Sequence, residues 1–182
     1  MIYASLALDS VVCALGLEFV EKIDLKKLVD MLLAAYADEW IASYYYTLTA
    51  YTIKGQNSEE ISEHFLEEAE EEWKKHARMI ADRLQDLDID PPREFSKLWE
   101  ISGCKYPEIP SDPYDIDGWI IAAVKAEECA IKAYRELYSY THGKDPVTEE
   151  LAEDILRDEV RHRTALLNLL SREGAKRIQG RS

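Results

Sequence analysis

Four stretches of the chain repeat their apolar residues at alternating steps of three and four positions, the spacing of one helix face. In the first stretch this face includes Leu28 and Leu32, and in the second it runs through Phe65, Ala69 and Met79. Only seven Gly and six Pro punctuate the 182 residues, which favours long helices over many short strands. We predict helices over residues 25–53, 59–87, 116–140 and 147–171.

The connections between the predicted helices differ greatly in length. Short turns around Gly55 and Gly143 join the first helix to the second and the third to the fourth. Residues 88–115, between the second and third helices, hold five of the six prolines and a short helix near residues 95–101. A connection of this length can cross a whole bundle. The pattern predicts an all-α fold: a four-helix bundle of two hairpins, with a long crossover between helices two and three.

A chain of 182 residues fits one domain with a core of its own. We assign residues 24–172 to the bundle, residues 1–23 to an N-terminal segment and residues 173–182 to a short basic tail. The N-terminal segment is apolar but contains Asp9 and Glu18, and no Lys or Arg precedes Lys22. We therefore expect neither a membrane span nor a signal peptide there, and we assign no role to Cys13.

Every predicted helix interrupts its apolar face with a glutamate, and the second and fourth helices add a histidine one turn later. Buried carboxylates are costly unless they are paired, and several in one core repel each other. Two bound cations would neutralise them, and oxygen ligands with two imidazoles suit iron or manganese. The candidate metal ligands are Glu39, Glu72, His76, Glu127, Glu159 and His162.

Taken one at a time, these residues carry little information. Glu39 alone is equally a solvated residue at the edge of its apolar face, and a single Glu-x-x-His arises often by chance in a Glu-rich chain. The joint pattern of one inward Glu on each of four helices and a His on two of them favours the metal site.

The other polar residues of these helices have simpler explanations. We expect His64 to lie on a flank of its helix, and Glu67, Glu68, Glu70 and Glu71 to form a solvated face. Tyr46 and Tyr134 each follow a candidate ligand by seven residues, so we expect their hydroxyls to hydrogen-bond to ligands.

The charge of the chain is strongly acidic, with 36 acidic and 22 basic residues and a net charge of −14. Such a surface repels nucleic-acid phosphates and attracts cations, although acidic surfaces more often only keep a protein soluble. We expect no direct nucleic-acid partner. The three cysteines do not make an even disulfide framework, so we expect a cytoplasmic protein. None lies in a Cys-x-x-Cys pair, which argues against a zinc ribbon.

Around these positions the chain resembles the ferritin-like di-iron superfamily, bacterioferritins in particular, and more closely the Dps-like proteins called thioferritins. The resemblance covers nearly all of residues 26–170. It is carried by residues 38–46 (DEWIASYYY), 72–76 (EWKKH), 101–104 (ISGC), 126–131 (AEECAI), 143–146 (GKDP) and 158–162 (DEVRH).

The resemblance implies a site for two iron ions in each subunit. In it Glu39 and Glu127 would each bind one metal, Glu72 and Glu159 would bridge both, and His76 and His162 would each bind one. It further implies a cysteine pair near the site, Cys104 and Cys129, as a redox or structural disulfide. One position departs from the bacterioferritin pattern, because Trp73 stands three residues before His76. Glu72 must then reach from four residues before, and we expect a local distortion such as a π-bulge.

The resemblance also implies an activity and an assembly. We expect a ferroxidase that oxidises Fe(II) with hydrogen peroxide or oxygen and stores the iron in a shell of identical subunits, a dodecamer, protecting against oxidative stress. The alternatives are a manganese catalase or oxidase on the same ligands, iron storage with slow chemistry, and a non-catalytic helical module.

Overall fold

The computed structural model describes residues 23–180, and these residues form helices without a β-strand. Except for Ile23, the predicted N-terminal segment, with Cys13, lies outside the described residues. The long helices are α2 (Leu25–Thr52), α3 (Ser58–Glu71), α4 (Ala77–Asp86), α6 (Ile116–Thr141) and α7 (Pro146–Leu169). The shorter ones are the π-helix η2 (Glu72–His76), α5 (Phe95–Ile101) and α8 (Arg172–Gln179).

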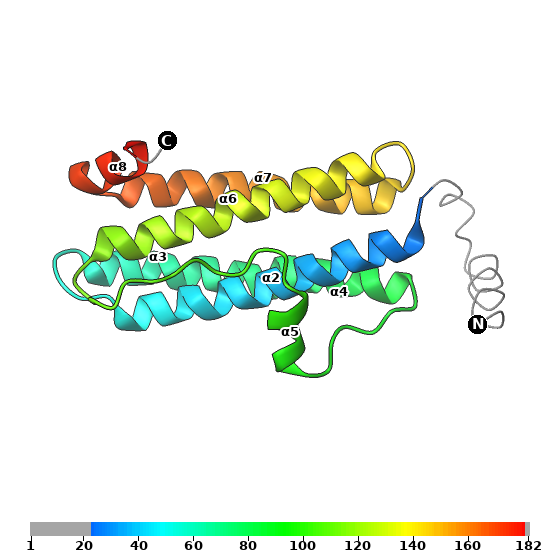
Figure 1. Ribbon diagram of the computed structural model, residues 1–182, viewed down its shortest axis with the longest axis horizontal. Helices are drawn as coiled ribbons and strands as arrows, with labels where there is room; N and C mark the ends of the chain where they lie inside the picture. Colours follow the sequence, from blue (N-terminus) through cyan, green and yellow to red (C-terminus); the bar gives the residue numbers. More distant parts are fainter. Residues whose placement is uncertain (1–22, 181–182) are drawn as a thin grey trace.

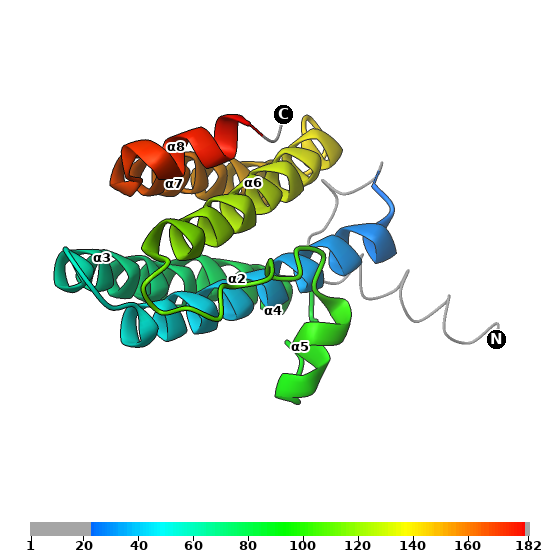
Figure 2. The same cartoon turned by 60° about the vertical axis from the view of Figure 1, so that its left-hand side comes forward.

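The long helices pair as two hairpins that pack against each other (Figures 1 and 2). One hairpin is α2 against α3 and α4, and the other is α6 against α7. Figure 1 shows the crossover leaving α4, passing through α5 and returning along the bundle to the start of α6. The predicted all-α, ferritin-like four-helix bundle with one long crossover is confirmed. Between residues 23 and 180, no helix has the length and apolar character needed to cross a bilayer.

A buried ion pair joins the two hairpins at one end of the bundle. Arg83 of α4 donates from Nη2 to Asp145 Oδ2 at 2.9 Å and from Nε to Thr148 Oγ1 at 2.8 Å. Asp145 also caps α7, because its carboxylate accepts from the backbone N–H of Thr148. Removing one partner of such a pair leaves an uncompensated charge in the core, so the contact fixes how α4 and α7 align.

The core consists of two apolar clusters at opposite ends of the bundle. One includes Phe65, Ile120 and Leu166, and the other includes Leu84 and Ile155. All five side chains are fully buried. The glutamates and histidines singled out by the sequence fall between the two clusters, in a polar layer enclosed by apolar ones.

The expected distortion of the second helix is present. The N–H of Ala77 bonds to the carbonyl of Glu72, five residues earlier, so residues 72–76 form a turn of π-helix between α3 and α4. The extra residue of this wide turn shifts the phase of the helix beyond it. Met79, expected on the core face, is therefore only half-buried, and Ile80 takes the buried position.

The short tail after the bundle contains a helix that the sequence analysis did not predict, because Arg172–Gln179 form α8. Ser171 caps this helix by accepting from the N–H of Gly174, and its own N–H and hydroxyl bond to Asp117 of α6. A Cβ at Gly174 would lie 2.5 Å from Asp117, so only glycine allows this approach. Arg177 then pairs with Asp115 at 2.7 Å.

Candidate metal centre

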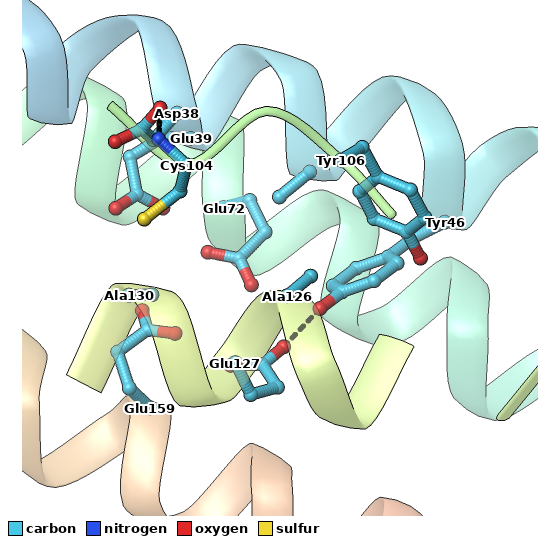
Figure 3. Close-up of a pocket in the computed structure, with 11 residues that line it drawn as sticks. Asp38, Glu39, Tyr46, Glu72, Cys104, Tyr106, Ala126, Glu127, Ala130 and Glu159 are labelled. Carbon is cyan, nitrogen blue, oxygen red and sulfur yellow. Dashed lines mark hydrogen bonds between the residues drawn. The ribbon is translucent and has the colours of Figure 1, made fainter. Parts of the chain in front are cut away.

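The six residues predicted as metal ligands come together in the middle of the bundle. Glu39 comes from α2, Glu72 and His76 from η2, Glu127 from α6, and Glu159 and His162 from α7. Each of the six is at most 3% exposed. Figure 3 shows the four glutamates around one small cavity, into which their carboxylates point.

The side chains form two overlapping groups. Glu39, Glu72, His76 and Glu159 offer ligand atoms within 4.8 Å of one another, and Glu72, Glu127, Glu159 and His162 do the same. Glu72 and Glu159 belong to both groups. This geometry suits two neighbouring cations with two shared carboxylates between them.

Several buried atoms of the cluster have no hydrogen-bond partner within the described residues. They are Glu72 Oε1, Glu127 Oε2, Glu159 Oε1 and His162 Nδ1. A buried polar atom left unpaired costs about 1–3 kcal/mol, so several in one layer favour a site at which they bind a shared partner. Because the unpaired atoms are carboxylate oxygens and an imidazole nitrogen, the residues present fit divalent cations.

The carboxylates of the metal-free cluster bind protons more strongly than ordinary glutamates. Burial and the neighbouring charge of Glu39 raise the pKa of Glu72 to about 8, and burial and Glu72 do the same for Glu159. Burial and Glu159 raise the pKa of Glu127 well above its usual value. Glu39 differs, because the contact with His76 outweighs burial and lowers its pKa. Near neutral pH the cluster therefore holds protons that an entering cation displaces.

Both histidines direct Nδ1 toward the carboxylates. His76 Nδ1 lies 2.8 Å from Glu72 Oε2 and 3.0 Å from Glu159 Oε1, and His162 Nδ1 lies 3.4 Å from Glu72 Oε1. Burial lowers the pKa of His162, but the facing carboxylates raise it more, to about 9. The inward nitrogen of each ring is the one available to a metal.

Two further carboxylates, not singled out by the sequence, contact the outward nitrogens of these rings. Asp158 Oδ2 lies 3.4 Å from His76 Nε2, and Glu71 Oε2 lies 3.1 Å from His162 Nε2. A carboxylate on the far nitrogen orients an imidazole ligand and fixes its tautomer. One signal was available in the sequence, because each of these residues directly precedes a shared glutamate.

The expectation that residues 67–71 present only a solvated glutamate face is therefore wrong. Glu71 is half-buried, and Arg161 Nη2 bonds to it at 2.8 Å. Although burial raises its pKa, the contacts with His162 and Arg161 lower the pKa of Glu71 to about 2. Glu68 is more deeply buried, at 4% exposure.

The two tyrosines expected to bond to ligands donate hydrogen bonds to glutamates of the cluster. The hydroxyl of Tyr46 donates to Glu127 Oε1, as the dashed line in Figure 3 marks, and that of Tyr134 donates to Glu39 Oε1. Both rings are fully buried. Burial and the facing carboxylate raise the pKa of each tyrosine well above its usual value, so both remain donors.

Cys104 and Cys129 form a disulfide that ties the crossover to α6, with a Cα–Cα distance of 5.7 Å. Asp38 holds the same stretch of the crossover by accepting from Ser102 Oγ at 2.6 Å and from the N–H of Cys104 at 2.9 Å. Cys104 lines the cavity that the four glutamates surround (Figure 3). The disulfide thus closes one side of the metal cluster.

Four long helices with one crossover, around a buried layer of glutamates and histidines, define the class of bundle proteins with a carboxylate-rich metal site. The chain belongs to the ferritin family: its residues 29–173 match the ferritin-like domain.

Among curated proteins, the chain is 33% identical over 149 residues to the DNA protection during starvation protein of Pyrococcus furiosus. The match covers 82% of this chain and 80% of that protein.

Among solved structures, the chain is similar to a dodecameric thioferritin, the bacterioferritin-related protein from Bacteroides fragilis. The identity is 35% and the TM-score 0.77, over 82% of this chain and 88% of that one. Dps from Thermosynechococcus elongatus matches with a TM-score of 0.74 over 81% of this chain and 92% of that one. At 16% identity, this second likeness supports the fold alone. The predicted resemblance to ferritin-like proteins and thioferritins is confirmed.

Proposed function

We propose that this protein is a ferroxidase, which oxidises Fe(II) with hydrogen peroxide, or with oxygen, and stores the product in a protein shell that limits oxidative damage. The observation that carries the proposal is the pair of overlapping ligand groups with two shared glutamates. A two-metal site of this kind suits an oxidant that accepts two electrons.

The six residues divide the binding of two iron ions between them. Glu39 and His76 would hold one ion, Glu127 and His162 would hold the other, and Glu72 and Glu159 would bridge both. Bound iron supplies the redox chemistry: two Fe(II) ions lose one electron each, and hydrogen peroxide takes both electrons and two protons to give two waters.

The surrounding side chains hold the ligands in position. Asp158 and Glu71 fix the tautomers of His76 and His162 by accepting from their outward nitrogens, so that each Nδ1 stays free for a cation. The apolar clusters on either side exclude bulk water, which strengthens every charge interaction in the layer.

The assembly that fits this function is a dodecamer of identical subunits, the state given for the Bacteroides fragilis relative. A net charge of −14 favours cations over nucleic-acid phosphates as partners, so we expect no direct binding to DNA. We assign the protein to the cytoplasm, where stored iron would be needed. Light scattering coupled to size exclusion tests the assembly, with an expected mass of twelve times the 21.0 kDa chain.

The activity is tested by mixing metal-free protein with Fe(II) under anaerobic conditions, adding hydrogen peroxide and following Fe(III) formation by stopped-flow absorbance. Glu127→Gln removes one ligand charge and should slow oxidation by about a hundredfold or more. The matched control is Glu128→Gln, the same change one residue along α6, where the side chain is exposed and pairs with Arg163. This control should oxidise iron at the rate of the unmodified protein.

Two results would overturn the proposal. One is equal rates for Glu127→Gln and the unmodified protein. The other is oxygen evolution from peroxide by the manganese-loaded protein, together with no faster iron oxidation than in protein-free buffer, which would make the protein a manganese catalase.

A further inference from the structure

A second group of buried, unpaired polar atoms lies beside the metal cluster, on α3. Glu68 stands one helical turn before Glu72 and is 4% exposed, yet neither carboxylate oxygen has a hydrogen-bond partner within the described residues. His64 stands one turn earlier still, and its Nε2 is also buried without a hydrogen bond. The sequence pattern had placed His64 on a flank of the helix and Glu68 on its solvated face.

The two side chains face each other. His64 Nε2 lies 3.0 Å from Glu68 Oε1, the distance of an ion pair, but the geometry is not that of a hydrogen bond. A protonated His64 would offset one charge and still leave the second carboxylate oxygen, Glu68 Oε2, unsatisfied. Leaving such a group unpaired in the core is costly, so the arrangement indicates a ligand that both residues share.

The chemistry of the pair is that of the neighbouring metal ligands. An imidazole and a carboxylate four residues apart on a helix can present a nitrogen and an oxygen to the same point, as His64 and Glu68 do in this order and Glu72 and His76 do in the reverse order. Oxygen and imidazole ligands suit divalent first-row metals. With two protein ligands and water for the rest, such a site binds more weakly than the six-residue cluster.

The location of the pair connects the surface of α3 with the cluster. The side chain of His64 is 24% exposed, whereas that of Glu68 is 5% exposed and lies on the inner side. Glu68 is also in electrostatic reach of the cluster: after burial and Glu159, its charge contributes to the raised pKa of Glu127. A cation between His64 and Glu68 would be one helical turn from the shared ligand Glu72.

We propose that His64 and Glu68 form a third divalent-cation site, which passes ions from the surface of α3 to the two-metal cluster. This inference rests on the proposed function, because it assigns a route for the iron that the cluster oxidises. The site binds its ion transiently, and the ion then moves to Glu72.

The site is tested directly by soaking crystals of the unmodified protein in Co(II) and locating the ions by anomalous diffraction. We expect three peaks in each subunit: two within the cluster and a weaker one between His64 and Glu68. In Glu68→Gln crystals the third peak should disappear while the two cluster peaks remain.

The route is tested by stopped-flow oxidation of Fe(II) with peroxide. At low Fe(II), Glu68→Gln should be slowed about tenfold, because a charge that concentrates cations has been removed. At saturating Fe(II) it should match the unmodified protein. The matched control is Glu67→Gln, an exposed neighbour on the same helix, which should behave like the unmodified protein at both concentrations.

The outcomes separate this inference from the proposed function. Two cluster peaks without a third, or an unchanged rate for Glu68→Gln at low Fe(II), would overturn the transit site and leave the ferroxidase proposal intact. An absence of Co(II) from the cluster itself would overturn the ferroxidase proposal.

Discussion

The residues around the metal cluster follow the same arrangement in both hairpins. In each hairpin a tyrosine seven residues after the first glutamate reaches across to the first glutamate of the other hairpin. The carboxylate that precedes each shared glutamate likewise contacts the histidine of the other hairpin. Each half of the site is therefore oriented by the opposite half, and the ligand geometry exists only when the two hairpins are docked.

The hydrogen bonds of Tyr46 and Tyr134 to glutamates of the opposite hairpin can be tested by removing each hydroxyl. Tyr46→Phe removes the hydroxyl that orients Glu127 and leaves a carboxylate oxygen unpaired in the core. We expect about tenfold weaker Co(II) binding, measured by titration calorimetry of the metal-free protein. Tyr134→Phe should do the same through Glu39. Tyr138→Phe is the control, because its ring packs on His142; equal Co(II) affinity in all three variants would contradict this role.

The sequence identified the six cluster residues from their joint pattern, but it could not identify every buried carboxylate near them. In the glutamate run of residues 67–72, the density of acidic residues favoured a solvated face, although Glu68 stands three residues after the buried Phe65 and shares its side of the helix. Asp158 lies about 100° around the helix from Glu159. Its contact with His76 is made across helices, so the one signal in the sequence was its position directly before the shared Glu159.

At the scale of the helices, the π-helix η2 allows Glu72 and His76 to reach the same site although they are four residues apart. Glu72 and His76 are four residues apart, whereas their counterparts on α7, Glu159 and His162, are three apart. The wide turn absorbs the additional residue, so α3 and α4 on either side keep the packing of one continuous helix. The unusual spacing beside Trp73 predicted this distortion, and the position of Ile80 follows from it.

Deleting Lys74 tests this interpretation. The deletion brings Glu72 and His76 to the spacing found on α7, and we expect the protein to stay folded because only the wide turn is lost. Deleting Lys132, exposed in the regular helix α6, is the control. It should lower the melting temperature sharply, because Tyr134 and the rest of α6 would rotate by about 100°. Equal melting temperatures for the two deletions, from scanning calorimetry, would refute this account of η2.

At the scale of the whole molecule, the periodicity of apolar residues and the proline-rich crossover were enough to predict the bundle. These signals are local, repeated over many residues, and agree with one another. Helix α8 was not predicted, because the contacts that hold it are made with residues far away in the sequence. Asp117 anchors its first turn and Asp115 pairs with Arg177, and neither contact leaves a pattern in residues 172–179.

The proton affinity of the cluster predicts how stability depends on pH. Glu72 and Glu159 keep their protons up to about pH 8 when folded, against an ordinary pKa of 4.5, and His162 keeps its proton to about 9 against 6.5. Between the ordinary and the raised pKa of each of these groups, the folded chain binds more protons than the unfolded chain. The free energy of unfolding therefore falls as the pH rises through that range. Glu39, whose pKa is lowered, has the opposite effect, but Glu72, Glu159 and His162 together outweigh it.

We therefore expect the melting temperature of the metal-free protein to fall as the pH is raised from about 5 to about 9. Loading the cluster with Co(II) before heating should remove most of this dependence, because the cations hold the carboxylates ionised throughout. Scanning calorimetry of both forms across the pH range makes the comparison. A melting temperature of the metal-free form that rises with pH would rule out the protonated cluster.

The bond between Cys104 and Cys129 has a consequence for handling the protein at the bench. Closing a loop of this length contributes roughly 3 kcal/mol, and a thiol reductant such as dithiothreitol would open it by exchange. Samples prepared with and without such a reagent then differ in covalent structure right beside the glutamates. Turnover numbers measured on the two kinds of sample describe two different molecules.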